Sequence, residues 1–401
     1  MIITKIFQSI YHPILHELRT FCSYKKLAKK INSLSEHEII SNKERKTRLF
    51  IVCTSFHNDS TRKGGINRVI QSLITEINKI SECYPIYLSQ SGCCYSDTND
   101  TVFFIKGDVL LFLGIENSLP CYKNYLEILR KNEIKIVTFI HDLIPIRTPR
   151  KSTTSSKRFC HFINTAISKS NLIIANSNYV AHDIRTYIEH TRKLKNYSKN
   201  LPIKYTYLGC NISNSYQPFE KKFSNFPVNF LMVSALAPRK KYDQAIKAFN
   251  ILWQNGVNVT FTIVGRALKK ESKKIVKLIE SNPYYNDKLF WRNGISDEKL
   301  KLEYQKADCV LFTSSAEGFG LALYEAASYK LPLIIRDLEV FKEIASDGAF
   351  YFNGFNKKNL SKKINEWIEL YKKDSHPKPI FQIQTWDKTA LNILKFIDEI
   401  N

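Results

Sequence analysis

The hydrophobic residues of this chain fall into two kinds of segment that alternate along its length. Some are short unbroken apolar runs, which are typical of buried parallel strands. In others, apolar residues recur every three or four positions, which is typical of amphipathic helices. Before residue 218 this pattern predicts strands at 49–53, 86–88, 109–113, 134–140 and 172–175, and helices at 66–77, 157–169 and 178–189.

The same alternation starts again after a polar, proline-bounded segment from Pro218 to Pro227. It predicts strands at 229–233, 259–264, 309–312 and 333–335, helices at 240–254 and 297–306, and a last helix from about Trp386 to Ile400. Two successive runs of alternating strands and helices predict an α/β protein with two doubly wound, Rossmann-like domains that face a cleft. A length of 401 residues also favours two domains.

Four segments are predicted: a basic amphipathic segment (1–46), a first Rossmann-like domain (47–218), a second one (219–385), and a C-terminal helix (386–401) that packs back on the first domain. Within 1–46, a helical apolar stripe is followed by four lysines between Lys25 and Lys30. Such a helix suits an anionic membrane surface, and it equally suits packing on the first domain.

Sixty Lys and Arg residues against 37 Asp and Glu residues give a net charge of +23, which favours anionic partners. Nucleic acid is not the expected partner, because the aromatic residues fall mainly in the predicted strands instead of alternating with basic residues on one element. The nine cysteines form no C-x-x-C pair, and reduced thiols in a cytoplasmic protein are expected. The first residues lack the features of a secretory signal.

The most informative motif is Glu317-Gly-Phe-Gly-Leu-Ala-Leu-Tyr-Glu325, directly after the apolar run 309–312. Glu317 is therefore predicted at the carboxyl end of a strand, where open α/β sheets bind ligands. The amides of Phe319, Gly320 and Leu321 come at the start of the next predicted helix, where backbone N–H groups are free to bind an anion. This arrangement suits a diphosphate with a sugar held by the two carboxylates.

Other candidate residues also follow predicted strands. Arg239 and Lys240 stand at a helix start, where positive side chains are unfavourable unless an anion lies between them and the helix. The pair Gly64-Gly65 lets backbone approach a ligand closely, although such a pair is often only a turn. Remaining candidates are His141 with Asp142, Asn176 with Ser177, Gly265 and Ile295. Asp142 is expected either to orient the His141 ring or to cap a turn, and Ser177 is expected to cap a helix.

The spacing of Glu317 and Glu325 resembles the donor-site signature of retaining glycosyltransferases with the GT-B fold, family four (group 1). The string His141-Asp-Leu-Ile-Pro-Ile resembles bacterial O-antigen and capsule mannosyltransferase-like enzymes. The resemblance implies a metal-independent hexosyltransferase without a cofactor, whose donor is a GDP-, UDP- or dTDP-hexose. The chain has no Asp-x-Asp pair, which metal-dependent glycosyltransferases use to hold a divalent cation.

The same resemblance implies roles for individual residues. Glu317 and His141 would contact the transferred sugar, and Glu325 would bind the ribose. Arg239 and Lys240 would neutralise the leaving diphosphate. The remaining implied donor contacts are Gly64, Gly65, Gly265, Ile295 and the amides of Phe319, Gly320 and Leu321.

The implied acceptor is a glycan or a lipid-linked oligosaccharide in O-antigen or capsule synthesis, at the inner face of the bacterial inner membrane. Three alternatives stay open from the sequence. One is a non-catalytic GT-B protein or an epimerase that binds a nucleotide sugar. The second is a nucleic-acid-binding protein. The third, a dinucleotide-dependent oxidoreductase, would need a G-x-G-x-x-G motif after a first strand, and neither predicted domain has one.

Overall fold

The computed structural model describes residues 47–53, 64–88, 94–96, 102, 104–115, 122–148, 154–197, 200–210, 227–268 and 271–400. The predicted amphipathic segment 1–46 and most of the predicted linker 218–227 lie outside these residues. The chain forms two compact units. The first comprises the described residues up to Thr206 together with the segment that starts at Trp386, and the second runs from Tyr207 to Thr385.

The first unit contains a seven-stranded sheet in the order β3-β2-β1-β4-β5-β6-β7. All neighbouring strands are parallel except β2 and β3, which are antiparallel. The strands are β1 (Leu49–Val52), β2 (Cys83–Leu88), β3 (Cys94–Ser96), β4 (Val109–Phe112), β5 (Lys135–Ile140), β6 (Leu172–Ala175) and β7 (Ile203–Tyr205). Every residue of β1, β4 and β6 is buried, as their unbroken apolar sequences predict.

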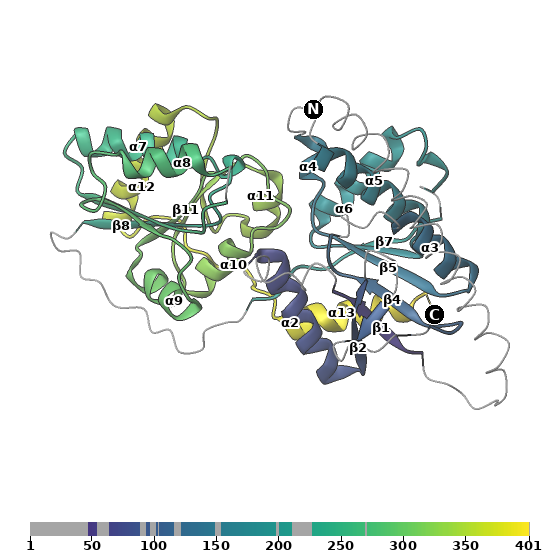
Figure 1. The fold of residues 1–401 in the computed structure, drawn as a ribbon. Helices are drawn as coiled ribbons and strands as arrows, with labels where there is room; N and C mark the ends of the chain where they lie inside the picture. Colours follow the sequence, from purple (N-terminus) through teal and green to yellow (C-terminus); the bar gives the residue numbers. More distant parts are fainter. Residues whose placement is uncertain are drawn as a thin grey trace, which may run out of the picture. The chain divides into compact units, whose positions relative to one another are not determined.

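Helices cover both faces of this sheet (Figure 1). They are α2 (Gly65–Ile80), α3 (Tyr122–Lys131), α4 (Ile144–Arg147), α5 (Thr154–Lys169), α6 (Asn178–His190) and α13 (Trp386–Asp398), with a 3-10 turn η2 (Lys195–Tyr197). The predicted apolar stripe of α2 is buried at Val69, Ile70, Leu73 and Ile77. The C-terminal helix α13 packs against α2, and Lys135 Nζ donates a hydrogen bond to the Ile400 carbonyl at 2.6 Å.

The second unit contains a six-stranded, fully parallel sheet in the order β10-β9-β8-β11-β12-β13. Its strands are β8 (Val228–Val233), β9 (Val259–Val264), β10 (Leu289–Arg292), β11 (Cys309–Phe312), β12 (Leu333–Arg336) and β13 (Phe350–Phe352). The order of connection reverses between β8 and β11. In doubly wound sheets this switch point opens a crevice at the carboxyl ends of the strands, where ligands bind.

The helices of the second unit are α7 (Tyr242–Gln254), α8 (Lys273–Glu280), α9 (Asp297–Lys306), α10 (Leu321–Ser328), α11 (Glu339–Ala345) and α12 (Lys357–Lys372), with a 3-10 turn η3 (Pro238–Lys240). In Figure 1, α7, α8 and α12 lie on one face of the sheet, and α9 and α10 lie on the other. The predicted helix 240–254 is wrong at its start. Lys241 adopts a left-handed conformation with φ of 56°, which separates η3 from α7.

Both sheets bury dense apolar cores that include several large aromatic side chains. Phe249 stacks on Phe261 with ring centroids 4.3 Å apart, and Trp367 is fully buried against Phe230. None of the helices in the described part of the chain combines the length and the apolar character that a bilayer crossing requires.

Candidate functional site

Two loops meet at the switch point of the second sheet, one after β8 and one after β11. Thr313 Oγ1 donates a hydrogen bond to the Lys240 carbonyl at 2.7 Å. The Ser315 amide and hydroxyl both donate to the Arg239 carbonyl, at 2.8 and 3.1 Å. These bonds fix the backbone of the basic Arg239-Lys240 turn against the loop that carries Glu317.

Glu317 forms ion pairs with both predicted cations. Arg239 donates to Oε2 of Glu317 at 3.0 Å and to the Ala316 carbonyl at 3.1 Å, and Lys240 donates to Oε1. Only 8% of Glu317 is exposed. Burial alone would raise the pKa of this carboxyl, but the charges of Lys240 and Arg239 and hydrogen bonds from Lys240 and Ser314 lower it to about 2. Glu317 is therefore an anion at any physiological pH.

The turn between Glu317 and α10 depends on a glycine. Gly320 has φ of +103°, and a Cβ there would lie 2.9 Å from the Phe341 ring, so the position excludes other residues. The Phe319 side chain is buried against Tyr324, which leaves only its backbone available to a ligand. Backbone N–H groups at the start of an α-helix lack acceptors in a preceding turn, which makes the start of α10 at Leu321 a favourable place for an anion.

Glu325 lies on α10, one turn further along. The hydroxyl of the buried Tyr304, on α9, donates a hydrogen bond to Oε2 of Glu325 at 3.0 Å. The Tyr304 ring stacks on Tyr329, with centroids 5.0 Å apart. Packing thus fixes the Tyr304 hydroxyl, and the hydroxyl holds the Glu325 carboxylate.

Gly265 ends β9 in close contact with the end of β8. A Cβ at this position would lie 1.8 Å from the Ser234 carbonyl oxygen, so only glycine fits. Ile295 is half-buried in the loop between β10 and α9, next to Gly294 with φ of 63°. Both residues therefore follow strands of the second sheet, as predicted. Their implied contacts with a nucleotide stay predictions.

The structure adds a charged residue that the sequence analysis missed. Arg336, the last residue of β12, is buried and donates hydrogen bonds to the carbonyls of Thr313 and Ser314. These hydrogen bonds fix the start of the loop that carries Glu317. The available signal was a basic residue that ends the apolar run Leu333-Ile-Ile.

In the first unit, His141 follows β5 and is 7% exposed. Its Nε2 lies 2.8 Å from the Leu113 carbonyl, which requires a proton on this nitrogen. Burial lowers the pKa of His141 to about 4, and the hydrogen bond to Leu113 raises it only in part. The ring is therefore neutral at neutral pH, with Nδ1 as its remaining acceptor.

Two neighbours of His141 have capping roles that the sequence analysis expected. Asp142 Oδ1 accepts a hydrogen bond from the Ile144 amide at 2.9 Å, so Asp142 caps the turn before α4. Ser177 is the N-cap of α6, as expected, and accepts from the Val180 amide at 3.1 Å. Asn176 donates to the His141 carbonyl at 2.8 Å, which fixes the backbone of His141.

Gly64 and Gly65 begin α2. Gly64 is the N-cap and Gly65 is the first helical residue, and a Cβ on Gly65 would meet nothing within 4 Å. Packing inside the protein therefore does not require a glycine at Gly65. The predicted roles of Gly64, Gly65 and His141 in donor binding stay predictions.

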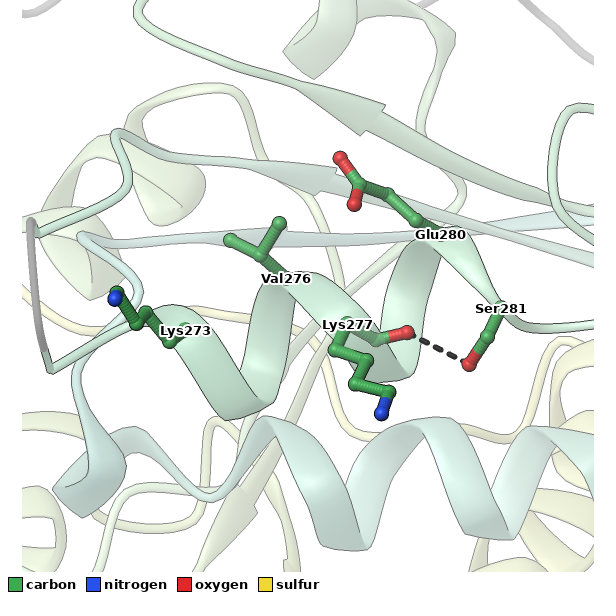
Figure 2. A pocket seen from close by; sticks show the side chains of 5 residues that line it. All are labelled: Lys273, Val276, Lys277, Glu280 and Ser281. Carbon is green, nitrogen blue, oxygen red and sulfur yellow. Dashed lines mark hydrogen bonds between the residues drawn. The ribbon is translucent and has the colours of Figure 1, made fainter.

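A shallow depression on the second unit lies apart from these candidates. Its lining residues all come from α8 and the residue after it, as Figure 2 shows: Lys273, Val276, Lys277, Glu280 and Ser281. Among the described residues, no group of three or more His, Cys, Asp or Glu side chains is arranged to hold a metal ion.

Comparisons with known proteins find a matching family model and several similar proteins. A family model described as "Glycosyl transferases group 1" matches residues 217–379. The serotype-specific mannosyltransferase WbdA of Escherichia coli is 30% identical over 409 residues, which cover 92% of this chain and 50% of that protein. The O-antigen chain mannosyltransferase RfbU of Salmonella typhimurium is 24% identical and covers 80% of this chain and 82% of that protein.

Solved structures with the same fold are more distant in sequence. Sucrose-phosphate synthase from Thermosynechococcus elongatus has a TM-score of 0.65 at 13% identity and covers 88% of this chain and 99% of that one. Anabaena HepE in complex with UDP and glucose has a TM-score of 0.62 at 14% identity, with coverage of 88% and 100%. This chain spans about half the length of the Escherichia coli relatives. Residues 217–379 match the group 1 glycosyl transferase family model, and the chain has the GT-B fold, which these solved structures share.

Proposed function

We propose that this protein is a retaining glycosyltransferase that moves a hexose from a nucleotide-diphosphate sugar to a glycan acceptor in surface polysaccharide synthesis. The observation that carries the proposal is the cluster of Arg239, Lys240 and Glu317 beside the first turn of α10. Two cations and the positive end of a helix surround a single carboxylate there. This excess of positive charge suits a diphosphate.

The proposed chemistry follows from that charge distribution. As the bond between the sugar C1 and the phosphate oxygen breaks, negative charge grows on the departing diphosphate. Arg239, Lys240 and the N–H groups of Phe319, Gly320 and Leu321 stabilise this charge, and each such donor contributes a few kcal/mol, about 3 in well-studied cases. The acceptor hydroxyl bonds to C1 on the same face and passes its proton to the departing phosphate oxygen.

Glu317 has two tasks in this proposal. Before the donor binds, it neutralises part of the charge of Arg239 and Lys240. With the donor in place, the phosphate oxygens compete for these cations, and the Glu317 carboxylate accepts hydrogen bonds from hydroxyls of the hexose. Before the donor binds, the pKa of about 2 keeps Glu317 ionised, so it remains a charged partner for Arg239 and Lys240.

Mannose from GDP-mannose is the first donor to test, because the WbdA and RfbU relatives are named mannosyltransferases. UDP- and dTDP-hexoses are the other donors. We propose a lipid-linked oligosaccharide as the acceptor and a cytoplasmic location at the inner face of the membrane. The net charge of +23 favours such an anionic surface.

Two measurements test the proposal together. Thermal shift with GDP, UDP, dTDP, NAD and an oligonucleotide identifies the ligand class, and stabilisation by a nucleoside diphosphate is expected. Mass spectrometry then follows products formed from a panel of nucleotide sugars and lipid-linked acceptors. An acceptor that gains one hexose supports the proposal. Epimerised sugar without transfer, or stabilisation by NAD or the oligonucleotide alone, contradicts it.

A further inference from the structure

Among the described residues, the hydrogen-bond acceptors of the buried cation Arg336 are all neutral groups. Arg336 is 3% exposed, and its guanidinium donates five hydrogen bonds, all to carbonyl or amide oxygens. Its acceptors are the carbonyls of Thr313, Ser314 and Gly354 and the side-chain oxygen of Gln244. Phe355 and Phe352 lie against its faces, with ring centroids 4.3 and 4.9 Å from Cζ.

Another arginine of this protein pairs with a carboxylate, as buried arginines usually do. Arg48, in the first unit, forms two hydrogen bonds with the carboxylate of the buried Asp108, at 2.9 and 2.6 Å. Arg336 is more deeply buried, yet among the residues that the structure describes no carboxylate pairs with it. Burial lowers the pKa of Arg336 to about 10, so its side chain keeps its charge at neutral pH.

An uncompensated buried charge is unfavourable for folding, and neutral side chains fill such positions at lower cost. The position of Arg336, next to the loop that carries Glu317, gives a reason for a charged residue here. Its guanidinium holds the Ser314 carbonyl, and the N–H of the same peptide group, on Ser315, donates to the Arg239 carbonyl. The Ser314 side chain hydrogen-bonds Glu317. Arg336 is thus linked to Arg239 through the Ser314–Ser315 peptide group, and to Glu317 through Ser314.

We propose that Arg336 is a third cation of the donor site, which positions the Thr313–Ser315 backbone and attracts the diphosphate by its uncompensated charge. This inference rests on the proposed function. It assigns Arg336 a positioning role, since the residue acts through the carbonyls of Thr313 and Ser314 that accept its hydrogen bonds. Its positive charge adds to those of Arg239 and Lys240, so a dianionic ligand is bound more tightly than these two partly buried cations alone would achieve.

Gln244 provides a test that leaves Arg336 in place. Gln244→Glu puts a carboxylate beside the guanidinium and neutralises its charge while the hydrogen bond between the two side chains remains. Gln244→Met is the matched control. Both variants lose the two long hydrogen bonds from Gln244 to the carbonyls of Gly354 and Asn356, at 3.3 Å. Gln244→Met also loses the hydrogen bond from Arg336, but only Gln244→Glu changes the charge.

The experiment is calorimetric titration of the full-length protein with GDP, UDP and dTDP, together with urea unfolding. We expect Gln244→Glu to bind the preferred nucleoside diphosphate about tenfold more weakly than Gln244→Met. Urea unfolding checks that both variants are folded under the conditions of the titration. Equal affinities would overturn the third-cation proposal and leave the proposed function standing. A wild-type protein that binds none of the three diphosphates would overturn both.

A second pair of variants guards against misfolding of the first. Arg336→Lys keeps the charge and loses the forked hydrogen bonds, whereas Arg336→Met loses both. If the charge matters, Arg336→Lys retains more affinity for the diphosphate than Arg336→Met, and the difference shrinks at high salt. If Arg336 only holds the loop in place, the two variants bind equally at every salt concentration, and the proposal is wrong.

Discussion

His141 and Glu317 each follow a buried parallel strand, β5 in the first unit and β11 in the second. Both are buried, and both have a pKa below the ordinary value. The causes are opposite. Burial keeps His141 neutral, whereas the cations Arg239 and Lys240 overcome burial and keep Glu317 charged.

The candidate residues of the two units therefore differ in charge. The site in the second unit consists of strong charges whose positions are fixed by backbone hydrogen bonds. The candidate residues of the first unit are an uncharged ring and the start of a helix, without an ion pair to His141 among the described residues. A charged ligand group is therefore expected to depend on the second unit.

The strongest test of this division removes a cation from the second unit. Lys240→Ala should lower sugar transfer by about 100- to 1,000-fold, because the leaving diphosphate loses a positive charge. Glu317→Ala should abolish transfer as well. Initial rates of product formation give the measurement, and Lys247→Ala, at an exposed lysine on α7, is the control. Normal turnover in Lys240→Ala and Glu317→Ala would contradict the division.

A second test concerns backbone packing, in which the units also differ. Gly265→Ala should lower the free energy of unfolding by about 3 kcal/mol or more, because its Cβ would collide with the Ser234 carbonyl. Gly65→Ala, in open space at the start of α2, should change it by less than about 0.5 kcal/mol. Urea unfolding measures both values. Similar stabilities of the two variants would show that the second unit tolerates rearrangement there.

His141 and Glu317 should affect the unfolding free energy in different ranges of acidic pH. The folded-state pKa of His141, about 4, lies below the ordinary 6.5, so the unfolded chain takes up its proton first as the pH falls. The unfolding free energy should drop by up to about 3 kcal/mol between pH 6.5 and 4 from this residue. The contribution of Glu317, whose pKa is about 2 instead of 4.5, should be lost only below about pH 4.5.

His141→Gln checks this assignment, because glutamine can still donate a hydrogen bond to the Leu113 carbonyl but does not titrate. Unfolding free energies of wild type and variant should converge as the pH falls from 6.5 to 4. A constant difference across that range would mean that His141 is not the group responsible.

The smallest predicted effect concerns Glu325. Tyr304→Phe removes the hydroxyl that holds this carboxylate, and we expect KM for the nucleotide sugar to rise about fivefold with kcat nearly unchanged. Tyr351→Phe is the control, because its hydroxyl bonds to Ser346 instead. A fall in kcat without a change in KM would argue that Glu325 acts on the reacting bond and not on the ribose.

The sequence predicted most of the scaffold, because buried parallel strands have unbroken apolar runs. Strands β6, β9 and β11 and helix α9 match their predicted bounds. Motif spacing also placed Glu317 at a strand end. Elements with weaker patterns were not predicted, among them the short edge strand β7 and helix α8. Their stability comes from tertiary packing, which local sequence does not reveal.

The site was only partly predictable for a related reason. Arg239, Lys240 and Glu317 were found from their motifs, but the ion pairs among them join loops more than 70 positions apart. Arg336 stands 22 positions from Ser314, and Tyr304 stands 21 positions from Glu325. Neither was identified, because a lone arginine after an apolar run and a lone tyrosine in a polar helix are common features without a specific meaning.

A crystal structure of the protein with GDP, or with the diphosphate that stabilises it most, would test the central claim directly. The account predicts that the phosphate groups lie against the side chains of Arg239 and Lys240 and the first turn of α10. Phosphates bound elsewhere, with Arg239 and Lys240 still paired to Glu317, would contradict it.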